Sequence, residues 1–129
     1  MADILTATQN AFYAALNVVG VTALGTLVQH VPEDSLPPLI IVGDISLEPI
    51  GGKDGGLDRA KVEIVTISRA PKRAVLFAMQ AAVRVALDGM PLTATGAIFS
   101  PAIMTASDGQ LIEDGLTYVG TQQFETFVQ

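Results

Sequence analysis

The chain has 129 residues, a net charge of −6 and no cysteine, and half of its residues are apolar. This length supports one domain, 1–129, with a core of its own, and the apolar content excludes an intrinsically disordered chain. The lack of cysteine excludes a disulfide framework, thiol catalysis and cysteine-ligated zinc. Charged residues make up only 16% of the chain, against about 25% in an average soluble domain. We infer that further copies or partners cover part of the surface.

The first predicted element is a helix from Asp3, a suitable N-cap, to Asn17, with Gly20 as its stop. The expected apolar stripe of this helix consists of Leu5, Phe12, Leu16 and Val19. Residues 21–38 are expected to form a connector, with a short strand at 27–28 as an alternative.

Two strands are predicted next, over 39–49 and 61–68. The first begins with an apolar run, continues with alternation and stops near Pro49. In the second, Val62, Ile64 and the methyl group of Thr66 alternate with Lys61, Glu63, Val65 and Ile67. The glycine-rich stretch 51–56 between them has the composition of a loop, so the two strands are expected to form a long hairpin.

The second half of the chain repeats the pattern of one helix followed by two strands. A helix is predicted between Pro71, which suits a first turn, and Gly89, which suits a stop. Its apolar face is expected to be Leu76, Met79, Val83 and Leu87, and its opposite side Arg73, Gln80 and Arg84. A strand is predicted over 92–104, with Pro101 either interrupting it or placing it at the edge of the sheet. Another strand is predicted over 116–128, and turns are predicted at 108–109 and 114–115.

This order predicts an α+β fold, αββαββ, in which two helices pack on one face of a mainly antiparallel four-stranded sheet. Residues 4–32 carry no formal charge, but polar residues and glycines interrupt the stretch, so we expect no transmembrane segment. No basic segment precedes it, as a signal peptide would require. The expectation is a soluble protein without a visible export signal.

The charges are segregated along the chain. All seven bases lie between residues 53 and 84, a segment with a net charge of +4. In 1–52 and 85–129 every charged residue is an acid, and each of these segments has a net charge of −5. One interpretation is that these segments form ordinary surface pairs within one subunit. The other is that a basic patch on one subunit meets an acidic patch on the next. For the second interpretation, the candidate interface residues are Lys53, Asp54, Asp58, Arg59, Arg69, Arg73 and Arg84.

Known catalytic patterns are not matched. The glycine-rich loop lacks phosphate-loop spacing, since Lys53 is followed by Asp54. His30 is the only histidine, and a triad assembled from its immediate neighbours would be too crowded. Asp44 and Glu48 share a strand face, where a solvated pair is the ordinary interpretation. We therefore assign no catalytic, cofactor-binding or metal-binding residue.

Six short motifs follow one another along nearly the whole chain. They are QNAFYAAL at 9–16, VPED at 31–34, PPLIIVGD at 37–44, ISR at 67–69, MQAAVRVAL at 79–87 and DGLTYVG at 114–120, which enters a strand containing Phe124. In this order they resemble the tail-terminator or tail-completion proteins of long-tailed phages and gene transfer agents.

The resemblance implies an α+β subunit that assembles, usually as a hexameric ring, at the head-proximal end of the tail tube. Such a ring stops tube polymerisation and joins the tail to the neck of the head. The implied partners are further copies, the tail tube protein and head-tail connector or neck proteins, while DNA passes through the lumen without sequence-specific binding. The implied location is the virion, after assembly in the host cytoplasm. The family is known for no catalytic or cofactor residues.

Two alternatives remain beside this interpretation. The nearer one is a head-side neck protein, an adaptor or a stopper, which would bind the portal rather than the tail tube. The more distant one is a small-ligand-binding or enzymatic domain related to ferredoxin-like folds. That alternative predicts an apolar pocket with converging polar groups.

Overall fold

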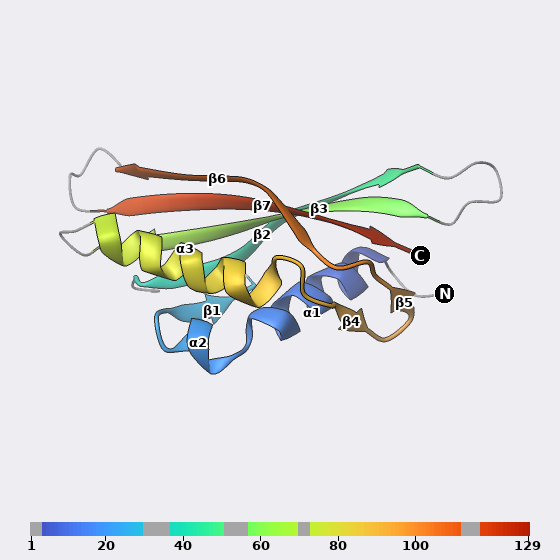
Figure 1. Cartoon of the computed structure of the whole chain (residues 1–129), viewed down its shortest axis with the longest axis horizontal. Coiled ribbons are helices and arrows are strands. Elements are labelled where there is room, and N and C mark those ends of the chain that lie inside the picture. The colour runs from blue at the N-terminus through green and yellow to red at the C-terminus, as the bar shows by residue number, and fades with distance from the viewer. Residues whose placement is uncertain (1–3, 30–36, 51–56, 70–72, 112–116) are drawn as a thin grey trace.

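A computed structural model of the chain describes residues 4–29, 37–50, 57–69, 73–111 and 117–129. Three helices lie on one face of a five-stranded sheet (Figure 1). The helices are α1 (Ile4–Leu16), α2 (Val19–Thr22) and α3 (Arg73–Leu87). The sheet has the order β1-β2-β3-β7-β6 and comprises β1 (Thr26–Val28), β2 (Leu39–Pro49), β3 (Asp58–Ser68), β7 (Tyr118–Val128) and β6 (Ile103–Leu111). A separate two-stranded sheet pairs β4 (Thr93–Ala94) with β5 (Ala97–Ile98).

The predicted four-stranded, two-helix arrangement is wrong. The connector 21–38 contains β1, which pairs in parallel with β2 from Thr26↔Leu39 to Val28↔Ile41 and makes the sheet mixed. It also contains the second half of α2, so Gly20 lies inside a helix instead of ending one. β1 confirms the alternative strand at 27–28. It forms because β2 satisfies its backbone hydrogen bonds, and no local periodicity encodes that pairing.

The predicted third strand, 92–104, is also wrong in its bounds. It divides into β4, β5 and the start of β6, and β6 continues to Leu111 through the predicted turn at Asp108-Gly109. In the sheet Gly109 pairs with Gly120 of β7. A Cβ atom at Gly109 would lie 3.0 Å from Leu76 Cδ2 of α3. The glycine therefore permits close helix packing on a strand, rather than a turn.

The β2–β3 hairpin is confirmed, and its antiparallel register runs from Leu39↔Ile67 to Pro49↔Asp58. A bulge between Val42 and Ile45 changes which side chains face the helices. Before it Ile40 and Val42 are buried; after it Ile45 and Leu47 lie opposite the buried Val62 and Ala60. The even-numbered side chains that follow the bulge, Asp44, Ser46 and Glu48, consequently lie on the outer face of the sheet.

The core lies between the helices and the inner face of the sheet. The predicted face of α3 is confirmed, since Leu76, Met79, Val83 and Leu87 are all buried. Of the predicted stripe of α1, Phe12 and Leu16 are buried, and the Phe12 ring centroid lies 6.5 Å from that of Phe124 on β7. Leu5 and Val19, in contrast, are 47% and 82% exposed. The buried stripe of α1 also includes Ala7, Thr8 and Ala11, so it is shifted around the helix from the predicted one.

Candidate functional site

The segregation of charge along the chain does not persist in the fold. β3 lies between β2 and β7, so its bases face acids of both neighbours. Arg59 NH1 lies 3.7 Å from Glu48 Oε2, and Lys61 Nζ lies 3.9 Å from Glu125 Oε1. On α3, Arg84 Nε lies 3.4 Å from Asp88 Oδ2. Three of the bases in the described ranges therefore pair within one chain, and these exposed pairs contribute little to stability.

Apart from Arg84, the predicted interface residues that the structure describes lie near the two ends of β3. Asp58 and Arg59 begin the strand, and the Arg59 guanidinium lies 5.8 Å from the Phe127 ring centroid. Arg69 follows the other end of the strand. Arg73 begins α3, with its guanidinium 5.5 Å from the ring centroid of Tyr118, and Arg84 lies three turns further along. Two members of the predicted set, Lys53 and Asp54, lie outside the described residues.

The outer side of the helices carries few charges. α1 and α2 contain no charged residue, and α3 carries only Arg73 and Arg84. Between these arginines Phe77 is 52% exposed, and beyond them Val85 is 77% exposed. A surface helix normally turns charged residues to solvent, so this surface is suited to being covered.

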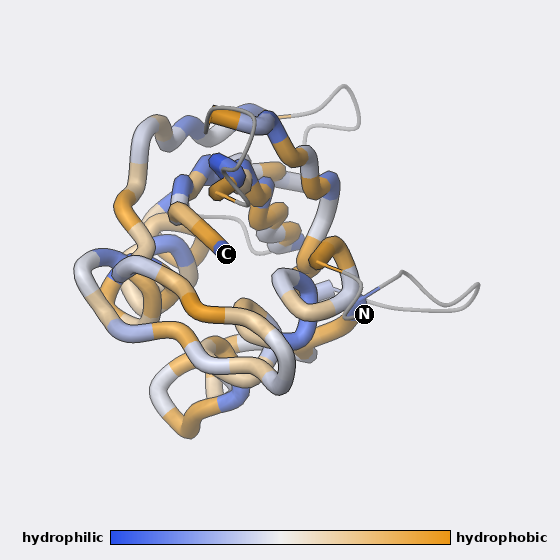
Figure 2. The backbone as a smooth tube through the Cα atoms, turned by 90° about the vertical axis from the view of Figure 1, so that its right-hand side faces the viewer, coloured by the Kyte–Doolittle hydropathy of each residue, from blue (hydrophilic) through white to orange (hydrophobic). Residues whose placement is uncertain are grey.

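A shallow apolar hollow of about 270 Å³ lies where α2 meets α3. Its lining contains only apolar residues and glycine: Val18, Gly20, Val21, Ala81, Ala82, Val85 and Ala86. In Figure 2, α2 is the lowest part of the view and carries hydrophobic colouring. We call these residues, together with Val19 and Phe77, the apolar helical surface. The part of this surface formed by Val18–Val21 lies within the uncharged stretch 4–32 of the sequence.

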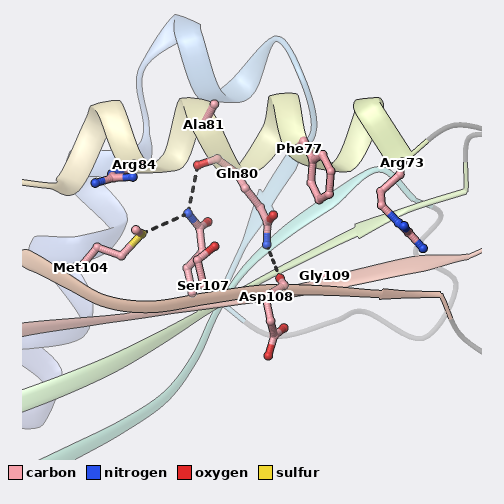
Figure 3. Close-up of a pocket in the computed structure, with 10 residues that line it drawn as sticks. Arg73, Phe77, Gln80, Ala81, Arg84, Met104, Ser107, Asp108 and Gly109 are labelled. Atoms are coloured by element: carbon pink, nitrogen blue, oxygen red, sulfur yellow. Dashed lines mark hydrogen bonds between the residues drawn. The ribbon is translucent and has the colours of Figure 1, made fainter.

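A second hollow, a groove of about 600 Å³, runs between α3 and the edge strand β6 (Figure 3). Its helix side is lined by Arg73, Phe77, Gln80, Ala81 and Arg84, and its strand side by Met104, Ser107, Asp108, Gly109 and Gln122. Gln80 lies on the same side of α3 as Arg73 and Arg84, as predicted, but it does not face solvent. Gln80 is only 7% exposed and turns toward β6.

Two glutamines connect α3 to the sheet beneath this groove. Gln80 Nε2 donates to the main-chain oxygen of Asp108 at 2.6 Å. Gln122 Nε2 donates to the main-chain oxygen of Gln80 at 3.0 Å. Gln122 Oε1 is buried and has no hydrogen-bond partner among the described residues. A buried acceptor without a donor carries a desolvation cost.

Asp88 fixes the far end of α3 to the start of β6. Its Oδ1 accepts a hydrogen bond from the Met104 backbone N–H at 3.0 Å, and its Oδ2 accepts one from Arg84 Nε at 3.4 Å. The backbone hydrogen bond first, and the Arg84 guanidinium second, hold the pKa of Asp88 below its ordinary value. Both partners favour the charged carboxylate.

The residues weighed for catalysis do not gather into a site. His30 lies outside the described residues. Asp44 and Glu48 lie exposed on the outer face of the sheet, and Glu48 pairs with Arg59. Within the described ranges, no three histidine, cysteine or acidic residues gather in a way that could hold a metal ion. None of the described helices is long and apolar enough to cross a membrane.

A family model described as tail completion protein gp17 matches residues 10–129. The chain belongs to that family. A chain from a solved structure titled virion of native gene transfer agent particle has the same fold, with a TM-score of 0.88 at 21% sequence identity. The match covers 99% of this chain and 98% of that chain. No curated protein matches the chain.

The resemblance to tail-completion proteins is thereby confirmed, and with it the location in a virion tail. This tail completion protein presents an apolar helical surface, an outer sheet face that carries seven of the twelve charged residues in the described ranges, and the α3–β6 groove. A structural component of a particle would use such surfaces for contacts with its neighbours.

Proposed function

We propose that this tail completion protein forms a ring that caps the head-proximal end of the tail tube, stops tube polymerisation and joins the tail to the neck. The observation that carries the proposal is the apolar helical surface, found on a chain of the tail completion family. An isolated subunit would leave Val19 and Val85 largely in water. Contiguous exposed apolar surface of this kind marks interaction sites.

A closed ring of one protein needs two different patches that meet between neighbouring subunits. The helical and outer sheet faces of this chain differ strongly in character, so the subunit has distinct surfaces to offer. The segregated charges are candidates for the contacts, namely Lys53, Asp54, Asp58, Arg59, Arg69, Arg73 and Arg84. Of these, Arg73 is the clearest, because its described neighbour is an aromatic ring rather than an acid.

The role we infer is structural rather than enzymatic, and no cofactor is required for it. The charges of the outer sheet face support the proposal that DNA passes through the ring without sequence-specific binding. In the described residues this face carries five acids and two bases, the acids being Asp44, Glu48, Glu63, Asp108 and Glu125. An excess of negative charge disfavours tight phosphate contacts, which need clustered Lys and Arg.

The proposal is tested by light scattering coupled to size exclusion, with the protein alone and with purified tail tubes. We expect a ring of defined mass, either free or on one end of the tube, and tubes that no longer elongate when tail tube protein is added. Tubes that elongate normally in the presence of the protein would contradict capping. Binding to the portal but not to tubes would instead indicate a head-side adaptor or stopper.

A further inference from the structure

Within the part of the chain that the structure describes, both edges of the five-stranded sheet are open. No described strand lies beyond β6 on its outer side. At the opposite edge, β1 covers β2 only from Leu39 to Ile41, so the stretch Val42–Pro49 has no described strand on its outer side. Open edges present unpaired N–H and C=O groups that can pair with another chain.

The edge strand β6 has few of the features that normally block such pairing. Protected edges use lysine, proline or short strands, whereas the nine residues of β6 contain neither lysine nor proline. Its single charged residue is Asp108, and Asp108 Oδ1 accepts a hydrogen bond from the Thr121 N–H of the same sheet at 3.3 Å. Its one irregularity is a bulge between Met104 and Ala106.

The side chains of the two edges also suit each other. On the helix side, the open stretch of β2 projects Ile45 and Leu47, both half-buried in the single subunit. Beside β6, the groove is bounded by small residues, Ser107 and Gly109, and by the half-exposed ring of Phe77. A strand added to β6 would place its helix-side residues next to Ser107 and Gly109, below Phe77.

The directions of the strands agree with this pairing. The sheet is antiparallel at β2–β3, β3–β7 and β7–β6, so β2 runs opposite to β6. A second copy related by rotation about an axis along the strands keeps its strand directions. It therefore presents β2 antiparallel to β6, and closing such a ring removes both open edges.

We propose that β2 of a second copy pairs with β6, so that neighbouring sheets join edge to edge and Ile45 and Leu47 of the second copy fill the α3–β6 groove. The inference rests on the proposed ring and names the surface that builds it.

The first test uses introduced cysteines, since the chain has none of its own. Three double variants sample three antiparallel registers on the outer face: Ser46→Cys with Ala106→Cys, Glu48→Cys with Ala106→Cys, and Ser46→Cys with Gln110→Cys. The control combines Ser46→Cys with Thr95→Cys in the exposed turn between β4 and β5. After oxidation, we expect one register to give at least about tenfold more covalent oligomer on non-reducing gels than the control.

The second test blocks each edge with lysine. Leu47→Lys and Ser107→Lys are expected to raise the concentration needed for assembly at least about tenfold, while the melting temperature of the monomer stays close to that of Thr95→Lys. The cross-linking result stands independently if either lysine variant does not fold.

The outcomes separate the two proposals. A ring that forms with no cross-link above control, and with both lysine variants still assembling, overturns the edge pairing and leaves the capping ring intact. A wild-type chain that forms no oligomer, alone or on tail tubes, overturns the proposed ring and the edge pairing with it.

Discussion

The side-chain amide of Gln80 on α3 donates a hydrogen bond to the main-chain oxygen of Asp108 on β6, with 2.6 Å between Nε2 and O. The bond joins residues 28 apart in the chain and fixes the helix above the edge of the sheet. It also explains why a helix with a buried apolar face carries one polar residue that is almost as buried.

Replacing Gln80 with leucine should remove this bond and leave the Asp108 oxygen without its side-chain donor. We expect a loss of about 1–3 kcal/mol in the free energy of unfolding, measured by urea denaturation. Gln123→Leu is the matched control, because Gln123 is exposed on β7. Equal stability of the two variants would show that the Gln80 bond contributes nothing.

Gly120 is required by the same packing. A Cβ atom there would overlap the Gln80 side chain and lie 2.8 Å from Thr66 Oγ1. Gly120→Ala should therefore destabilise the fold by about 1–3 kcal/mol. Gly20→Ala provides the comparison: nothing lies within 4 Å of its Cβ position and Gly20 is helical, so this change should be neutral or stabilising by up to about 1 kcal/mol. Thermal melts of both variants distinguish the two positions.

Asp88 should make stability depend on acid pH. Its pKa is lowered in the fold by the Met104 N–H and then by Arg84. The folded state therefore binds the proton less readily than the unfolded state. The stabilisation is present above the ordinary pKa and is lost as the pH falls through the folded pKa. We expect the unfolding free energy of the wild type to fall more steeply below about pH 4 than that of Asp88→Asn. Parallel pH profiles would contradict this.

The apolar helical surface should matter for assembly and not for folding. Val85→Glu places a charge on a side chain that is 77% exposed, so monomer stability should change by no more than about 0.5 kcal/mol. Assembly with further copies or with the tail tube should weaken at least about tenfold. Thr95→Glu carries the same charge elsewhere and should assemble normally. Tube capping by Val85→Glu at the wild-type concentration would exclude this surface as a contact.

The basic residues of α3 offer a separate test of charge complementarity. Reversing Arg73 and Arg84 to glutamate should weaken ring assembly more than it lowers monomer stability, because exposed pairs contribute about 0–1 kcal/mol within a chain. The effect should be largest at low salt and should shrink as screening increases. Light scattering across a salt series measures it. If the double variant assembles as well as wild type at low salt, these arginines do not form the contact.

Local patterns predicted those parts of the fold that depend on local chemistry. The β2–β3 hairpin was predictable because two alternating strands flank a glycine-rich stretch. The buried face of α3 was predictable because Leu76, Met79, Val83 and Leu87 recur at helical spacing. The alternative strand at 27–28 is confirmed by β1. Its parallel pairing with β2, the helix α2 and the passage of β6 through Asp108-Gly109 were not predictable, because their stability comes from partners far along the chain.

The interaction surfaces also divide into features that the sequence determines and features that depend on tertiary packing. The sequence by itself determined how few charges the chain has, that its bases are confined to one segment, and that 4–32 carries none. Only the tertiary structure decided where those charges lie, since strand register pairs Lys61 with Glu125 and Arg59 with Glu48. The packing of α2 against α3 likewise collects Val18 and Val85 around one hollow. Composition is a property of the chain, whereas a surface exists only once distant segments are packed side by side.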